Sequence, residues 1–263
     1  MIELNLVIII ILILLAFICE YVDSTLGMGY GTALAPILLL FGFKPLQIVP
    51  VILLSELITG LLAASLHHRE GNVNLRFFKN GISHHLKIAL ILAACSIIGT
   101  IAAVFIAVNI PKFWLKMYIG CLVFVMGIII LITLNKKYSF SWSKITSLGL
   151  IASFNKGISG GGYGPVVMGG QILSGVESKN AVGITSLAEG LTCFVGIITY
   201  LLTVKNGIDW TLAPYIITGA VIAVPFSAKS VKRISVRNLK LAIAALTIFL
   251  GIITIVKTLS SLI

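Results

Sequence analysis

The chain has 263 residues, of which 59% are hydrophobic and only 10% are charged. Soluble domains carry roughly 45–50% apolar and about 25% charged residues, so the composition excludes an ordinary soluble protein and predicts a single transmembrane domain over 1–263, with the lipid bilayer around it. The net charge of +11 comes from basic residues that lie between apolar runs without interleaved aromatic residues, which argues against nucleic acid as a partner.

Seven apolar runs are each long enough to form a helix that crosses the bilayer. In chain order they are 4–21, 46–66, 86–108, 114–134, 180–203, 211–228 and 239–260. Residues 31–42 and 162–174 follow glycine clusters and are predicted to form short or broken helices, and 145–158 forms a further span. Broken helices are tolerated in a bilayer where their free backbone groups face protein or water. The sequence therefore predicts an all-α polytopic membrane protein with about ten crossings.

The positions of the basic residues predict how these spans are oriented. With the N-terminus outside, the inner connections are 22–30, 67–87, 135–144, 174–180 and 229–240, and they hold most of the Lys and Arg residues. Cytoplasmic connections of polytopic proteins carry such a basic excess. We expect a multi-pass protein of the cell (inner) membrane with both termini outside. A re-entrant arrangement of either glycine-rich region would change this count.

Two glycine-rich segments indicate an internal repeat. Gly27–Gly31 aligns without gaps with Gly160–Gly164 at an offset of 133 residues, and the same offset pairs Glu56 with Glu189. Each half contains five predicted spans, and this odd number makes the two halves inverted repeats. Inverted repeats with broken helices at matching places are typical of secondary transporters, although channels can be built the same way. The predicted repeat halves are 1–134 and 135–263.

The glycine segments are candidate sites for an anion. Glycine permits an unwound backbone, and the free N–H groups at the start of the following short helix attract negative charge. Small residues at this spacing also let helices pack closely, so packing is the alternative role. The candidate residues are Gly29, Tyr30, Gly31, Gly162, Tyr163 and Gly164.

Three further polar residues, two of them near these segments, are candidates for substrate binding. Lys156 can be the cationic contact for an anion, or it can pair with a carboxylate or extend to the membrane interface. Asn155 precedes it, and Thr185 lies inside a predicted span. For Thr185, a hydrogen bond that only supports packing is the alternative.

Buried carboxylates are the candidates for ion coupling. Glu56 and Glu189 lie near the centres of the spans 46–66 and 180–203, where a carboxylate is costly and marks a proton relay or an ion ligand. The alternative is a protonated glutamic acid that hydrogen-bonds a neighbouring helix. We assign proton coupling to both, together with Asp23, the repeat equivalent of Lys156.

No metal centre, cofactor or soluble catalytic site is predicted. The pairs His67-His68 and His84-His85 lie in basic connections and are expected to be solvated, and no cysteine or carboxylate cluster accompanies them in the sequence. The connections are also too short to build a catalytic domain. We therefore expect a protein that is not an enzyme.

The duplicated glycine motif with its short apolar helix, in Gly27–Leu40 and Gly160–Leu173, resembles the sulfite exporter TauE/SafE family, also called domain-of-unknown-function family 81. The resemblance covers essentially the whole chain. It implies an inner-membrane permease for small sulfur-containing anions such as sulfite or organosulfonates, driven by an ion gradient. The halves differ, since Thr32 stands where the second motif has Pro165, so the two sides of a site would be unlike.

Together these features predict a secondary transporter of a small anion, coupled to an ion or proton gradient, that works by alternating access. Its partners are the anionic substrate and the bilayer, and a homodimer is compatible with the pattern. One alternative is a passive anion channel. Another is an intramembrane enzyme in which buried Glu and Lys act in acid-base chemistry.

Overall fold

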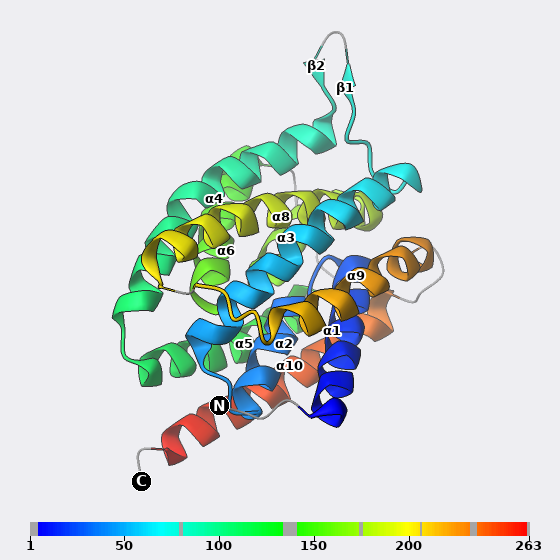
Figure 1. Ribbon diagram of the computed structural model, residues 1–263. Coiled ribbons are helices and arrows are strands. Elements are labelled where there is room, and N and C mark those ends of the chain that lie inside the picture. The colour runs from blue at the N-terminus through cyan, green and yellow to red at the C-terminus, as the bar shows by residue number, and fades with distance from the viewer. Residues whose placement is uncertain are drawn as a thin grey trace.

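The computed structural model describes residues 5–78, 81–133, 141–173, 176–205, 207–231 and 236–261, and these ranges are helical almost throughout (Figure 1). The first half holds α1 (Leu6–Leu26), α2 (Tyr30–Leu40), α3 (Pro45–Arg69), α4 (His84–Asn109) and α5 (Lys112–Thr133). The second half holds α6 (Trp142–Ser159), α7 (Tyr163–Leu173), α8 (Ser178–Thr203), α9 (Ala213–Ser230) and α10 (Val236–Ser260). A small hairpin of β1 (Phe77–Phe78) and β2 (Gly81–Ile82) lies between α3 and α4.

The predicted all-α fold is confirmed, and the second helix of each half is short. Both α2 and α7 have 11 residues and begin at the tyrosine of the glycine motif. Within the described ranges, six helices are long and apolar enough to cross a membrane by length and composition. The six segments are Leu6–Leu26, Pro45–Arg69, His84–Asn109, Lys112–Ile132, Ser178–Thr203 and Lys240–Ser260. Ten crossings and the inverted orientation of the halves stay predictions.

The expected inner connection 22–30 is wrong in its first part, because α1 continues through it to Leu26. Asn5 caps the start of α1 by accepting a hydrogen bond from the N–H of Ile8 at 2.9 Å. Gly27 ends the helix in the left-handed conformation, with φ +70°. Since the polar residues of the last turn, Asp23 and Ser24 among them, face protein instead of lipid, hydropathy alone placed the end of the span too early.

The helices of the two halves pack in corresponding ways. Equivalent helices meet each other, since α3 packs along α8 and α5 along α10, while α1 packs on α9 as α6 packs on α4. Two glycines allow the close approach of α3 and α8, because an added Cβ on Gly60 would lie 3.1 Å from the Cα of Gly190. Gly60 lies one turn after Glu56 and Gly190 directly follows Glu189, so the two acidic residues lie beside this close approach.

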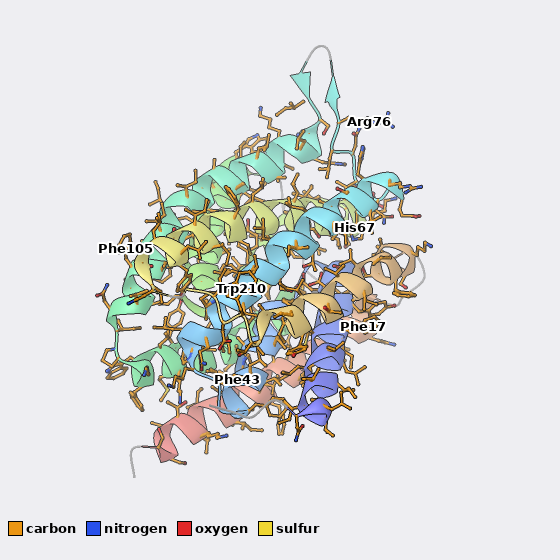
Figure 2. The ribbon with its side chains drawn as sticks, in the orientation of Figure 1. Phe17, Phe43, His67, Arg76, Phe105 and Trp210 are labelled. Carbon is orange, nitrogen blue, oxygen red and sulfur yellow. The ribbon has the colours of Figure 1, made fainter. Side chains whose placement is uncertain are left out.

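Large apolar side chains cover the outer surface of the helices (Figure 2). Phe105 on α4, labelled in that figure, is 52% exposed, and Leu202 on α8 is 82% exposed. Exposed apolar surface on this scale would be unfavourable in water and fits contact with lipid chains. The polar groups are concentrated inside, between the helices that both halves contribute.

Candidate functional site

The centre of the site is a buried lysine that contacts two glutamates. Lys156 lies in the last turn of α6 and is fully buried. Its Nζ donates a hydrogen bond to Oε1 of Glu189 at 2.7 Å and forms a salt bridge with Oε2 of Glu56. The glutamates come from α8 and α3 and are 5% and 3% exposed. The two predicted coupling acids and the predicted cationic contact thus form one ion-paired cluster.

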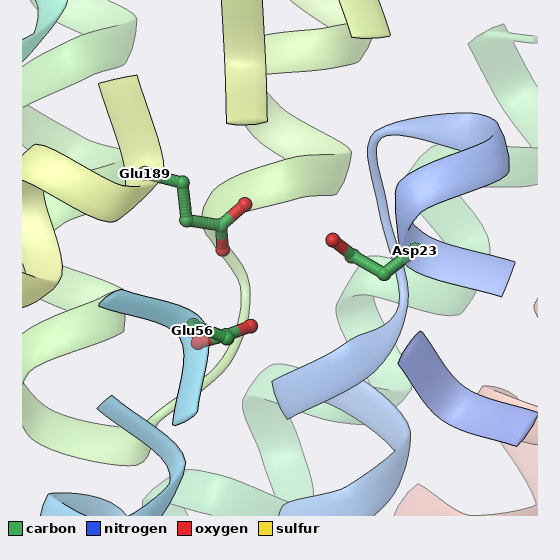
Figure 3. Close-up of side chains that lie close together, drawn as sticks. All are labelled: Asp23, Glu56 and Glu189. Atoms are coloured by element: carbon green, nitrogen blue, oxygen red, sulfur yellow. The ribbon is translucent and has the colours of Figure 1, made fainter. Parts of the chain in front are cut away.

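Asp23 completes a group of three carboxylates that converge from α1, α3 and α8 (Figure 3). One carboxylate oxygen from each of Asp23, Glu56 and Glu189 lies within 4.8 Å of the other two. Asp23 also holds the start of α2, since its Oδ1 accepts a hydrogen bond from the backbone N–H of Tyr30 at 3.1 Å. The ammonium of Lys156 is the cation that contacts two of these three carboxylates.

Glu20 is a fourth buried acid, to which the sequence analysis gave no role. It is 2% exposed, and it accepts hydrogen bonds from Ser24 Oγ at 2.5 Å and from Thr59 Oγ1 at 3.1 Å. The spacing of Glu20, Asp23 and Ser24 in the sequence could have identified Glu20, because residues three and four apart lie on one face of a helix. Glu20 therefore points in the same direction as Asp23 and Ser24, toward α3.

The cluster has an excess of acidic groups. Four of the eight acidic residues of the chain line one cavity, and Lys156 pairs with two of them. Oε1 of Glu56 has no hydrogen-bond partner among the described residues. Carboxylates this close to one another resist being ionised together, and an unpaired buried charge is costly. Added protons or cations are needed for the site to be electrically balanced.

A small polar cavity lies among these groups. Its volume is about 10 Å³, which is enough for about one water molecule. Acidic, hydroxyl and small side chains line it, namely Glu20, Asp23, Ser24, Glu56, Thr59, Gly60, Ala63, Ser186 and Glu189. The helices therefore close around the charged groups in this conformation.

The glycine segments adopt the unwound backbone that the sequence predicts. Gly29 has φ +132° and its repeat equivalent Gly162 has φ +77°, values that are strained for residues with a side chain. Each of these glycines lies directly before a short helix, at Tyr30 and Tyr163. Both tyrosine rings are fully buried.

The same segments also pack directly against each other, backbone to backbone. A Cβ on Gly31 would overlap the carbonyl oxygen of Gly160, and a Cβ on Gly164 would lie 2.6 Å from the carbonyl oxygen of Gly27. Small residues are thus required where the two motifs cross. The packing role that the sequence left as an alternative is present in the structure.

Two N–H groups of the glycine segments already have partners in this conformation. The N–H of Tyr30 donates to the carboxylate of Asp23, and the N–H of Gly162 donates to Oγ1 of Thr32 at 3.0 Å. The N-terminus of α2 therefore attracts negative charge, as helix N-termini do, and the charge in place belongs to the protein itself.

The other predicted polar site residues form hydrogen bonds between neighbouring helices. Asn155 Oδ1 accepts a hydrogen bond from the hydroxyl of Tyr118 at 2.7 Å, and Thr185 Oγ1 accepts one from Gln171 Nε2 at 2.8 Å. The hydroxyl of Tyr30 is hydrogen-bonded to Ser55 Oγ at 2.7 Å. These contacts join helices that carry the cluster to their neighbours.

His67 is buried, so its expected solvated position is wrong. It lies in the last turn of α3, where its Nδ1 accepts a hydrogen bond from the Asn72 amide at 3.0 Å and its Nε2 donates one to the carbonyl of Ser24 at 2.8 Å. This network assigns the neutral tautomer with the proton on Nε2. The ring fastens the end of α3 to the turn of α1 that carries Asp23.

Sequence comparison identifies the family. The profile of the sulfite exporter TauE/SafE family matches residues 12–254. The chain belongs to the TauE/SafE family. A curated relative, the "Probable membrane transporter protein YtnM" of Bacillus subtilis (strain 168), is 26% identical over 238 residues, which cover 84% of this chain and 75% of the relative. No solved structure gives a significant match.

The TauE/SafE match extends from α1 to α10 and therefore includes every residue of the charged cluster. The family resemblance inferred from the paired glycine motifs is confirmed. The family and the relative point to a membrane transporter rather than to an enzyme, and the six apolar helices support a multi-pass membrane protein.

Proposed function

We propose that this TauE/SafE protein is a secondary transporter that moves a small anion, such as sulfite or an organosulfonate, together with protons. The observation that carries the proposal is the salt-bridged position of Lys156 between Glu56 and Glu189. The family description supplies the class of anion. The geometry supplies the reason for coupling.

Glu56 and Glu189 compete with the anion for the ammonium of Lys156. While both are ionised, their two negative charges exceed the single positive charge of the lysine, and they repel other anions. When they take up protons, Lys156 loses the two carboxylates with which it is paired and becomes a poorly compensated buried cation, which is unfavourable. An arriving anion removes this penalty, so the anion binds together with protons and both move in the same direction.

Asp23 plays the corresponding part at the start of α2. Its carboxylate accepts a hydrogen bond from the N–H of Tyr30, and protonation of Asp23 weakens this bond. The backbone donors of Gly29, Tyr30 and Gly31, with their equivalents in the second motif, then supply further anion contacts. Asn155 and Thr185 flank this position.

The way the halves meet supports alternating access. Glu56 and Glu189 lie on the equivalent helices α3 and α8, which pack on each other. Rocking of one inverted half against the other about this contact would open the site to each side in turn. The ion pair between Lys156 and Glu56 bridges the two halves, since Glu56 belongs to the first half and Lys156 to the second.

Flux measurements in proteoliposomes test the proposal. We expect saturable uptake of sulfite or a sulfonate, in preference to carboxylates, that is accelerated when the outer solution is more acidic. The double variant Glu56→Gln/Glu189→Gln keeps the side-chain size but cannot take up protons at these two positions, so its flux should respond much less to the pH gradient. The Glu70→Gln variant, at the C-terminal end of α3 outside the cluster, is the matched control and should respond like the parent.

Two results would overturn the proposal. If no anion of this panel is transported, the assigned function is wrong. If flux is non-saturable and ignores the gradient in the parent protein, a passive anion channel replaces the coupled transporter.

A further inference from the structure

A second, larger cavity lies where α1 ends and α8 begins. Its volume is about 310 Å³. The side chains of Lys179 and Glu177, which line it, are 47% and 62% exposed, so the cavity reaches the surface of the protein. Thr25, Met168 and Val182 line its inner part.

The two cavities have adjoining walls. On α1, Ser24 lines the acidic cavity and the next residue, Thr25, lines the larger one. On α8, Ser186 lines the acidic cavity, and Val182, one helical turn earlier, lines the larger one. A barrier of about one helical turn, roughly 5.4 Å, separates the surface-connected cavity from the charged cluster.

The barrier is formed by the end of α1, by α8 and by a flexible side chain of α7. An added Cβ on Gly27 would lie 3.3 Å from the Cα of Val182 and 3.1 Å from Sδ of Met168. Methionine is unbranched and readily changes its rotamer. A small movement of Met168 and of the last turn of α1 would join the two cavities.

On the opposite side of the cluster, the structure is closed by apolar packing. Ile52 and Leu53, one turn before Glu56 on α3, are fully buried. Cys193 and Ile197, one and two turns after Glu189 on α8, are 0% and 5% exposed. All four belong to one apolar core cluster. The layer of protein between Lys156 and the surface is therefore thin on the side of the larger cavity and thick on the opposite side.

We propose that the larger cavity is the cytoplasmic vestibule of the transporter and that Val182, Met168 and the end of α1 form its gate. This inference rests on the proposed function. The side is assigned from charge, because Arg69 and Lys229 lie in the last turns of α3 and α9 at this end of the bundle, and basic residues mark the cytoplasmic side. The volume suits a small anion with several water molecules of about 30 Å³ each.

Accessibility of introduced cysteines tests the vestibule. In a parent chain with Cys95 and Cys121 replaced by alanine, we would compare Ser178→Cys at the mouth with Val182→Cys at the gate. A membrane-impermeant thiol reagent is applied to either face of sealed vesicles. Both cysteines should react from the cytoplasmic face, Val182→Cys more slowly, and its modification should abolish anion flux. Thr199→Cys, on the same helix beyond Glu189, is the control and should not react from that face.

The face from which each cysteine reacts is measured without substrate, so this test of the vestibule remains valid even if the proposed anion is not transported. Labelling of Val182→Cys from the outer face alone would overturn the vestibule. So would complete modification of Val182→Cys with flux unchanged in a protein that transports the anion.

Discussion

Replacing Lys156 by methionine should destabilise the protein at neutral pH. Methionine fills a similar volume without charge and leaves Glu56 and Glu189 buried without their counter-ion. Removing one partner of a buried ion pair costs about 3–5 kcal/mol, and here two carboxylates lose the same partner, so we expect the upper end of that range. For a chain of this size, this corresponds to a fall in Tm of roughly 10–20 °C.

The response to acid should also differ between the two proteins. In the parent, Lys156 compensates part of the negative charge of the carboxylates, and in Lys156→Met this compensation is lost. Protons remove uncompensated negative charge, so lowering the pH should raise stability more in Lys156→Met than in the parent.

Thermal unfolding in detergent, followed between about pH 5 and pH 8, measures both effects. The triple variant Lys156→Met/Glu56→Gln/Glu189→Gln is the matched control, since it removes all three charges and should recover most of the lost stability. If Lys156→Met unfolds at the same temperature as the parent at neutral pH, with the same pH slope, the ion pairs do not hold the halves together.

Two further predictions concern the glycine segments. Gly31→Ala places a methyl group on the carbonyl of Gly160 and should cost about 3 kcal/mol through overpacking. Gly71 has φ +72°, and nothing lies within 4 Å of a Cβ added there, so Gly71→Ala should cost only about 1–2 kcal/mol of backbone strain. Equal losses of Tm in the Gly31→Ala and Gly71→Ala variants would contradict the close crossing of the two glycine motifs. Thr32→Val leaves the N–H of Gly162 without its acceptor and should cost about 1–3 kcal/mol. Thr32→Ser keeps the hydroxyl and should unfold near the parent temperature in the same experiment; indistinguishable Val and Ser variants would refute the bond.

The order and type of the helices could be predicted from the sequence because their signals are local. Apolar runs set the long helices, and the glycines at the ends of α1 and α6 set the starts of α2 and α7. Hydropathy misplaced the end of α1, since its last turn is polar and faces protein.

Part of the site was also predictable. The offset of 133 residues paired Glu56 with Glu189 and Asp23 with Lys156, and the structure brings these four residues together. Their contact could not be deduced from the sequence, because it depends on how α3 packs on α8 and how α6 lies beside them. His67 was misjudged for a similar reason. A histidine next to basic residues is typical of a solvated end, and only the fold shows the carbonyl of Ser24 and the amide of Asn72 that it bonds.

The opposite charges of Asp23 and Lys156 at equivalent positions break the symmetry between the two halves. A symmetric dimer of either half alone would place two aspartates or two lysines at this point, without the attraction that the present chain has between Lys156 and Glu56. The charge balance of the cluster therefore depends on a difference between the halves, and a change that made them identical at this position would remove it.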